Sequence, residues 1–528
     1  MLYATLMLAA AALQAPGPRQ RPAPAPAPPP TLVVHITLDQ FRADYLDRWR
    51  SQLTGGLARL LRQGAVFTSA YQDHAMTETA PGHATVLSGR NPHSTGIVRN
   101  DEGVPDTTAI GRLVGVMGPG ASPWRFRGTE LFDWIKARYP DARALSVSRK
   151  DRAAILPVGK ARQQVYWYVF GRFTTSRYYA DTLPDWVKAF NLAMIPARAP
   201  GRRWDLLLKP SAYQEPDSEP YENRGRGVTF PHDLPPDSFQ ASIMVMGTPF
   251  MDSLTLAFAL DGVNQLQLGK GPSPDLLAVS LSTTDAIGHA FGPNSREIHD
   301  QVLRLDRYLG QFLDSLDRLR DERRIVVSLT SDHGVTSYVQ WSRAHGDPAA
   351  LEVRADTLVS AVEAALEARA GSSRWIRFFD LGMFVMDRAG LQAKGINVDS
   401  VVADVRTRMH ALPGVWRVDT PRELASADTA KDPIARRWLN AIPSDLGVEL
   451  CVTLKPHDVW GPTTTAEHGQ PSEDDAHVAL IIAGAGVRPG RYSRRVQVAD
   501  IAPTLARLLG VPPLETLDGR VLSEALRR

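Results

Sequence analysis

Two apolar stretches, Leu276-Leu-Ala-Val-Ser-Leu281 and Ile325-Val-Val-Ser-Leu-Thr330, decide the fold class. Both are nearly continuous aliphatic runs, as expected of strands that are buried on both faces of a parallel sheet. Between them, residues 296–319 repeat apolar side chains at the spacing of an amphipathic helix. A strand, a helix and a second strand predict parallel pairing through a right-handed crossover. We therefore expect an α/β fold with a mostly parallel central sheet flanked by helices.

The same alternation of strands and helices continues along the chain, with two interruptions. Residues 163–247 are rich in aromatic residues, Pro and Gly and predict an insertion made of loops. Residues 335–462 change to a mixed α+β pattern and predict a second insertion that caps the site. We place the catalytic domain at residues 31–528. Its other expected strands are 32–38, 66–71, 144–147 and 477–483, with helices at 46–61, 129–138 and 499–509; the cap is expected to hold helices 356–368 and 398–412 and strands 375–385 and 448–454.

The N-terminal residues predict export from the cytoplasm. Residues 2–13 are apolar and Ala-rich, are too short to span a bilayer, and are followed by the small residue Ala15. We expect a signal peptide at residues 1–15, although a basic segment is missing, and an uncleaved N-terminal anchor is the alternative. The Pro-rich residues 16–30 predict a stiff linker. No later run of eighteen apolar residues occurs, so we expect no transmembrane body. The leader predicts a periplasmic or secreted protein, and we expect it to be a monomer.

Composition narrows the possible functions. The chain has 528 residues, of which 43% are hydrophobic and 22% charged, which is enough for a large core. It carries 60 Lys and Arg against 57 Asp and Glu, so its net charge of +3 does not predict nucleic-acid binding. Cys451 is the single cysteine, which excludes an intrachain disulfide and a Cys-rich zinc cage. Any metal site must therefore consist of His and carboxylate residues.

Carboxylates and imidazoles follow three of the predicted strands. Ligands of open α/β sheets bind beyond the carboxyl ends of the strands, so these side chains are expected to meet at one edge. One strand-end aspartate is often only a helix cap, but three carboxylates together would repel unless a cation neutralised them. Ligands of this type, without Cys, suit zinc, with manganese or iron as alternatives. The residues concerned are Asp39, Asp285, His289, Asp332 and His333.

The stretch Thr77-Glu-Thr79-Ala-Pro-Gly-His83 predicts a nucleophile at the start of a helix. A Thr hydroxyl is a weak nucleophile, but a neighbouring divalent cation stabilises its alkoxide, which favours Thr79. The Pro-Gly pair suits the first helical turn, whose backbone N–H groups would point at an anion. In the alternative interpretation, Thr77 or Thr79 only caps this helix. We expect structural roles for His35, His74, His83 and His93.

Together these motifs, with a late His468-Gly469, resemble the alkaline phosphatase superfamily in its type I phosphodiesterase and nucleotide pyrophosphatase branch. The resemblance runs from about Val33 to the C-terminus, with five motifs in the family's order. It implies two zinc ions per chain. Asp285, His289 and His468 would hold one, with His477 as the alternative to His468. Asp39, Asp332 and His333 would hold the other, with Thr79 facing it.

The residues that would contact the substrate phosphate favour a monoester. Asn100 matches the phosphate-contacting Asn of the family that the chain resembles. Lys150 and Arg152 follow the predicted strand 144–147, and strand alternation would point both toward the same rim. A monoester dianion carries more charge than a diester, so extra cations favour monoesters. This region resembles the phosphate-irrepressible, PafA-type alkaline phosphatases. We therefore expect a broad phosphate monoester hydrolase with a phosphothreonine intermediate.

Other functions fit the sequence less well. A phosphodiesterase or nucleotide pyrophosphatase would use the same metals, but Ala80 replaces the aromatic residue that often precedes the Pro in diesterases. A sulfatase would need a Cys/Ser-x-Pro-x-Arg motif, which is missing. A phosphoglycerate-mutase-like isomerase prefers manganese and a Ser nucleophile and does not suit an export signal. A non-catalytic carbohydrate- or metal-binding envelope protein is the alternative from another class.

Overall fold

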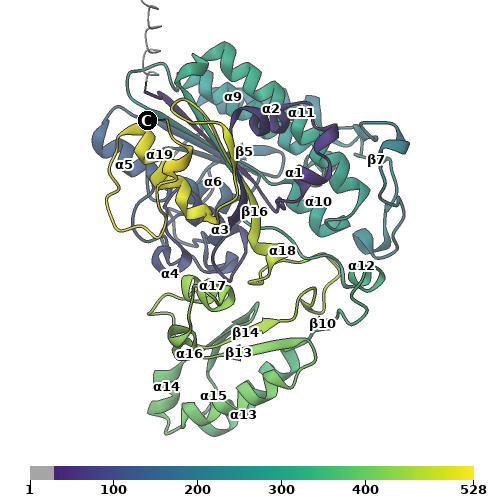
Figure 1. The fold of residues 1–528 in the computed structure, drawn as a ribbon, viewed down its shortest axis with the longest axis vertical. Helices are drawn as coiled ribbons and strands as arrows, with labels where there is room; N and C mark the ends of the chain where they lie inside the picture. Colours follow the sequence, from purple (N-terminus) through teal and green to yellow (C-terminus); the bar gives the residue numbers. More distant parts are fainter. Residues whose placement is uncertain (1–28, 528) are drawn as a thin grey trace, which may run out of the picture.

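The centre of the molecule is a ten-stranded sheet (Figure 1) in a computed structural model that describes residues 29–527, apart from the side chains of residues 194–198. The predicted signal peptide and most of the predicted linker lie outside the described residues. The strand order is β17-β2-β16-β9-β1-β8-β3-β4-β5, with β18 beside β2. β16 is antiparallel to both neighbours and β5 is antiparallel to β4, whereas the other pairs are parallel. The strands are β1 Leu32–Leu38, β2 Ala65–Tyr71, β3 Ala144–Ser148, β4 Gln164–Val169, β5 Arg172–Thr174, β8 Asp275–Leu281, β9 Ile325–Thr330, β16 His477–Gly484, β17 Gly490–Tyr492 and β18 Val496–Gln497.

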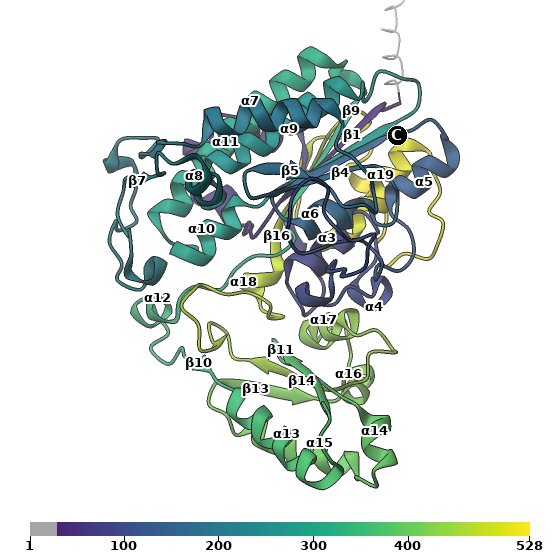
Figure 2. The same cartoon turned by 180° about the vertical axis from the view of Figure 1, so that it is seen from behind.

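Helices cover both faces of this sheet, which confirms the predicted α/β class (Figures 1 and 2). Alternate residues of β1 point to opposite faces: Val34 and Ile36 belong to one buried cluster and Val33 to another. The first cluster includes α2 Gly56–Gln63, α9 Phe250–Gln265 and α11 Arg296–Leu319, and the second includes α3 Thr79–Val86, α5 Leu131–Arg138, α6 Asp151–Ile155 and α19 Ile501–Leu509. Within residues 29–527 no single helix is long and apolar enough to cross a bilayer; one bent pair, 238–247 with 250–265, has that length and composition only when both halves are combined.

The helix predicted at residues 46–61 is interrupted. It consists of a short α1, Tyr45–Arg48, and of α2, which begins only at Gly56. The side chain of Asp306 on α11 accepts hydrogen bonds from the backbone N–H groups of Thr54 and Ala58, at 2.7 and 3.1 Å. A partner from a distant helix therefore caps α2, which the local pattern of apolar residues does not reveal.

The first predicted insertion also starts later than expected. β4 and β5 fall within residues 163–247, yet they extend the central sheet because their aromatic side chains are buried in its core. The remainder of the segment holds helices and a short β-ribbon beside α10 Thr283–Phe291 and α11 (Figure 2). Its elements are α7 Asp185–Arg198, β6 Arg203–Trp204, β7 His232–Asp233 and α8 Ser238–Met244.

The second predicted insertion forms a cap with a core of its own below the carboxyl edge of the sheet (Figure 1). Its four strands pair antiparallel in the order β11-β12-β14-β13. The predicted strand at 375–385 is a hairpin, because Leu381 and Gly382 turn the chain with positive φ angles. The elements of the cap are α13 Asp356–Ala370, β11 Ile376–Asp380, β12 Met383–Met386, α14 Arg388–Ala393, α15 Val398–His410, β13 Val415–Asp419, α16 Pro421–Ser426, α17 Pro433–Ala441 and β14 Val448–Leu454.

A buried carboxylate on α11 holds the first insertion in place, and its removal should destabilise the protein. Asp300 accepts hydrogen bonds from the Trp204 indole at 2.7 Å and from the Tyr213 hydroxyl at 2.6 Å. We expect Asp300→Ala to lower the free energy of unfolding by about 3 kcal/mol, because these donors lose their partner in a buried place. Denaturant unfolding measures this loss. Asp314→Ala, an exposed carboxylate on the same helix, should cost less than about 1 kcal/mol; equal losses would contradict the assignment.

Candidate metal centre and active site

Three aspartates meet at the carboxyl edge of the sheet. β1 pairs in register with β8 on one side and with β9 on the other, so the residues that follow the three strands lie side by side. Asp39 follows β1 directly, Asp332 follows β9, and Asp285 lies in the first turn of α10 after β8. All three carboxylates are buried.

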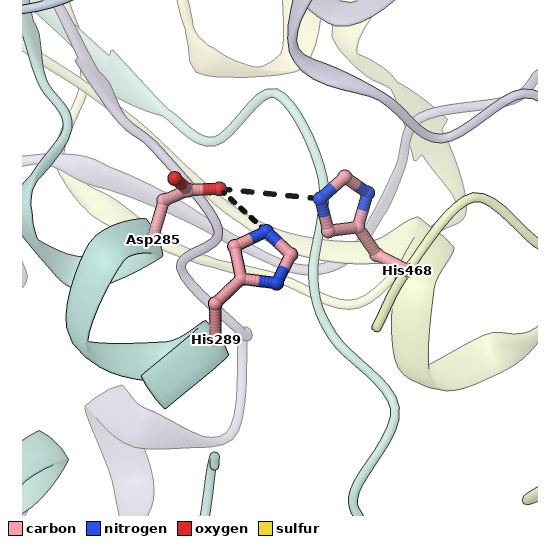
Figure 3. A group of neighbouring side chains, drawn as sticks. All are labelled: Asp285, His289 and His468. Atoms are coloured by element: carbon pink, nitrogen blue, oxygen red, sulfur yellow. Dashed lines mark ion pairs between the residues drawn. The ribbon is translucent and has the colours of Figure 1, made fainter. Parts of the chain in front are cut away.

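Three imidazoles join these carboxylates. The possible ligand atoms of Asp285, His289 and His468 lie within 4.8 Å of one another, as do those of Asp39, Asp285 and His333. Figure 3 shows the first group: Asp285 and His289 project from one helix toward His468, which comes from the opposite side. The Oδ1 atom of Asp285 lies 3.4 Å from His289 Nε2 and 3.9 Å from His468 Nε2.

The hydrogen bonds of the three histidines direct the same ring nitrogen toward the cluster. Each Nδ1 lies within 2.9 Å of a backbone carbonyl oxygen, that of Ala466 for His289, of Gly334 for His333 and of Thr77 for His468. A carbonyl oxygen only accepts, so Nδ1 carries the proton, and in a neutral ring Nε2 keeps a free lone pair. This backbone-fixed tautomer is the arrangement that metal-binding histidines usually have.

The buried charge of the cluster fits a cation. Asp39 Oδ1 and His333 Nε2 are buried without hydrogen-bond partners and lie 3.6 Å apart. Burial, and then the charges of Asp285 and Asp332, raise the pKa of Asp39. Burial alone would also raise the pKa of Asp285, but the Lys150 ammonium and His289 hold it well below its usual range. The residues present therefore fit divalent metal ions, which would partner the free carboxylate and imidazole atoms.

Lys150 lies at the centre of this arrangement. Its Nζ is 2.8 Å from Asp39 Oδ2, 2.8 Å from Asp285 Oδ2 and 3.0 Å from the hydroxyl oxygen of Thr79. Thr79 is the first residue of α3 and is buried. One ammonium group thus connects the hydroxyl to two carboxylates, which places Thr79 at the cluster.

Thr77 lies in a different position from Thr79. Its hydroxyl donates to the carbonyl oxygen of Gln470 at 2.9 Å and accepts from the N–H of Gly469 at 3.1 Å. It neither caps α3 nor contacts Lys150, and it instead ties the two loops that carry Thr79 and His468.

The sequence predicted that Lys150 and Arg152 alternate along a strand, and the structure shows that they do not. β3 ends at Ser148, Lys150 is the N-cap residue of α6, and Arg152 lies in the first turn of that helix. The two side chains therefore leave a helix terminus, so strand alternation does not orient them. The charge of Arg152 acts on Glu78, the residue before Thr79.

Glu78 is a site residue that the sequence did not single out. Its carboxylate accepts hydrogen bonds from both the backbone N–H and the side-chain Nδ2 of Asn100, each at 3.0 Å. The Oδ1 of Asn100 accepts from the N–H of Ala80 at 2.9 Å. Burial, and then the charge of Asp380, raise the pKa of Glu78 to about 7. Glu78 therefore fixes the orientation of the Asn100 amide. A sequence motif could not reveal this contact, because the two residues lie 22 positions apart.

The remaining histidines lie outside the two ligand groups. His83 contacts Ser280 Oγ at 2.8 Å and the Thr79 carbonyl oxygen at 2.9 Å, and its Nδ1 lies 3.1 Å from Asp332. His477, the alternative to His468, starts β16, stacks on Tyr71 and belongs to neither group. The structure thus brings His468, and not His477, to Asp285 and His289.

Comparisons with known proteins agree with this geometry. Residues 33–420 match the family model for type I phosphodiesterase / nucleotide pyrophosphatase. The chain is 30% identical to alkaline phosphatase PafA of Elizabethkingia meningoseptica over 94% of both chains. It is 32% identical to alkaline phosphatase PhoK of Sphingomonas sp over 93% of this chain and 90% of that one. The crystal structure of wild-type PafA superposes with a TM-score of 0.86 at 28% identity, over 95% of this chain and 99% of that one. The chain therefore belongs to the type I phosphodiesterase and nucleotide pyrophosphatase family.

Proposed function

We propose that this chain is an alkaline phosphatase, a phosphate monoester hydrolase with a broad substrate range. The observation that carries the proposal is the position of Lys150, which contacts the Thr79 hydroxyl and two carboxylates of the candidate metal centre. PafA and PhoK, which are similar over nearly the whole chain, are named alkaline phosphatases, and this supports the assignment. A phosphodiesterase or nucleotide pyrophosphatase with the same ligand set is the alternative.

The ligand set supports two zinc ions per chain. Asp285, His289 and His468 would hold one ion, and Asp39, Asp332 and His333 would hold the other, next to Thr79. Such ions supply Lewis-acid stabilisation of charge on the attacking and leaving oxygens. His and carboxylate donors without Cys suit zinc in this role.

Thr79, Lys150 and Asn100 have distinct roles in the proposed reaction. The Thr79 oxygen attacks phosphorus as the bond to the leaving oxygen breaks, which gives a phosphothreonine that water then hydrolyses. The ammonium of Lys150 stabilises the developing charge. Asn100, held by Glu78 and Ala80, keeps one N–H of its amide for a phosphate oxygen.

The cations at the start of α6 favour a monoester over a diester. A monoester presents three non-bridging oxygens and an additional negative charge to Lys150 and Arg152. The guanidinium of Arg152 has a buried Nε without a hydrogen-bond partner among the described residues, so it has donor capacity left for a phosphate. A diester replaces one charged oxygen by a neutral ester group and gains less from these cations.

We infer that residues 1–15 are an export signal, that 16–30 are a linker and that the enzyme works as a periplasmic or secreted monomer on small phosphate monoesters. Residues 31–528 form its catalytic domain, and the inserted segments near 163–247 and 335–462 shape the approach to the site.

Metal content and its pH dependence test the ligand set. We expect close to two zinc ions per chain, with activity lost on chelation. In the metal-free protein burial lowers the pKa of His289, but Asp285 outweighs this and the pKa is about 9. His289 must then lose a proton to bind zinc, so affinity should rise roughly tenfold per pH unit up to about pH 9. Titration calorimetry measures this slope. His468→Ala should lose one ion, whereas His477→Ala, the matched control, should keep both.

Substitution of Thr79 tests the nucleophile. Thr79→Ala should retain the zinc content but lose several orders of magnitude in monoester turnover, because no oxygen remains to attack phosphorus. Thr79→Ser keeps the oxygen and should stay active. Rate measurements with nitrophenyl phosphate and mass spectrometry of trapped phosphoprotein provide the readouts. If Thr77→Ala were inactive and Thr79→Ala were active, Thr79 would not be the nucleophile.

The ratio of monoester to diester hydrolysis tests the substrate class. Replacing Lys150 and Arg152 together by Ala should reduce kcat/KM for nitrophenyl phosphate far more than for its methyl diester, since each charge-assisted contact contributes about 2–3 kcal/mol. Asn100→Ala, which removes a neutral donor, should affect both substrates similarly. If kcat/KM fell equally for the two esters in the double variant, Lys150 and Arg152 would not select monoesters, and the phosphodiesterase alternative would be favoured.

A further inference from the structure

α4 Pro92–Thr95 of the body, by which we mean the central sheet and the helices on it, faces α17 of the cap (Figures 1 and 2). Beside this contact lies a groove lined by four cationic and two acidic side chains. It has a volume of about 470 Å³. The body contributes the loop that leads to Glu102 and also Trp124, Arg125 and Lys160, whereas the cap contributes Arg377 and the segment around Asp445. We call this the basic groove. It contains none of the candidate metal ligands, and its volume suits a small organic ligand.

In the part of the chain that the structure describes, three cationic side chains of the basic groove, Arg125, Lys160 and Arg377, form no ion pair within 4.0 Å; the charge of Arg125 acts on the more distant Asp106. Arg125 donates to the backbone oxygen of Pro105, and Arg377 donates to that of Leu446. Among the described residues, Lys160 has neither a side-chain hydrogen bond nor an ion pair within 4.0 Å. Unpaired cations that converge on one hollow repel each other, so an anion with several oxygens would stabilise them.

The acidic residues of the basic groove do not offset this charge. Asp445 is engaged by Arg127, whose two Nη atoms lie 3.0 and 2.8 Å from its oxygens. Glu102 lies 3.5 Å from Arg99, which does not line the basic groove. The side chains that line the basic groove therefore carry a net positive charge, with Arg125, Arg127, Lys160 and Arg377 against Glu102 and Asp445.

An aromatic surface accompanies these cations. The Trp124 side chain is 52% exposed, and its Nε1 donates to the carbonyl oxygen of Pro105 at 3.1 Å, which holds the ring in place. The guanidinium carbon of Arg125 lies 4.0 Å from the centre of the indole. A large apolar ring kept at the surface beside free cations can stack on a planar ring of a ligand.

We propose that the basic groove binds a nucleotide at a site separate from the metal centre. The base would stack at Trp124 and Arg125, and the phosphate oxygens would accept hydrogen bonds from Lys160 and Arg377. A phosphate without a ring, or a ring without a phosphate, satisfies only half of these groups. The inference does not depend on which phosphoester the metal centre hydrolyses.

The basic groove also borders the loop that carries Asn100. Glu102 and Asn100 share one turn of 3-10 helix, and Arg377 lies on β11 with Asp380, which pairs with Arg99 at 3.1 Å. A nucleotide held by Lys160 and Arg377 therefore bridges the body and the cap next to this loop.

The test counts AMP sites by titration calorimetry on the zinc-loaded Thr79→Ala protein, which should not consume the ligand. A protein that also carries Lys160→Ala and Arg377→Ala should bind one AMP fewer per chain than this parent. Trp124→Phe should weaken the same site by roughly tenfold, since it removes part of the stacking surface. Adenosine and pyrophosphate should each bind this site at least tenfold more weakly than AMP.

Matched controls separate this site from general effects. Lys394→Ala removes an exposed cation of the cap, and Trp416→Phe alters an indole that is 51% exposed; both should leave the number of sites and the affinity unchanged. With Thr79 intact, Lys160→Ala/Arg377→Ala should hydrolyse nitrophenyl phosphate at the normal rate. If the Thr79→Ala/Lys160→Ala/Arg377→Ala protein binds as many AMP molecules per chain as the Thr79→Ala protein, the proposal is overturned. Equal affinity of the site for pyrophosphate and AMP would overturn it as well. Absence of monoesterase activity would overturn the proposed function and leave the count of AMP sites as it is.

Discussion

The concentration of buried negative charge at one sheet edge is the constraint on which the rest of the site depends. The strand register causes this concentration of charge. β1 pairs in register with β8 on one side and β9 on the other, so Asp39, Asp285 and Asp332, which follow these strands, lie together. Carboxylates in such a place are stable only beside cations or donors. Lys150 supplies one positive charge, and the free atoms of Asp39 and His333 leave room for more. The arrangement of the strands thus creates an environment that suits cations, whatever reaction takes place there.

The loop that follows the cap in sequence completes this site with His468. His468 follows the cap in sequence and reaches Asp285 because its loop is tied to the loop before α3: its ring donates to the Thr77 carbonyl, and the Thr77 hydroxyl bonds to Gly469 and Gln470. The ring of His468 also stacks on that of His333, with centroids 3.8 Å apart. The side chain of Gln470 also donates to the carbonyl oxygen of Leu381 in the cap at 3.3 Å, so the loop that carries His468 contacts both the Thr77 loop and the cap.

Sequence patterns predicted the elements whose periodicity is local. The strands 276–281 and 325–330 and the helix 296–319 are confirmed, since continuous apolar runs and helical spacing leave few alternatives. The helix predicted at 46–61 was interrupted by Asp306, a residue about 250 positions away. A long-range contact of this kind leaves no trace in a local pattern. The orientation of Lys150 and Arg152 was predicted on the wrong basis for a local reason: β3 ends at Ser148, and the chain turns into α6 before the two residues could alternate along a strand.

Glu78 shows what such contacts add to the site. It holds the amide of Asn100, its pKa is raised by burial and by Asp380, and Asp380 belongs to β11 of the cap and pairs with Arg99 beside Asn100. The donor proposed for the substrate phosphate is therefore oriented by a carboxylate that responds to a charge of the cap. The Thr79 helix and the cap therefore act on this amide by different routes: the N–H of Ala80 donates to it directly, whereas Asp380 acts only through its charge effect on Glu78.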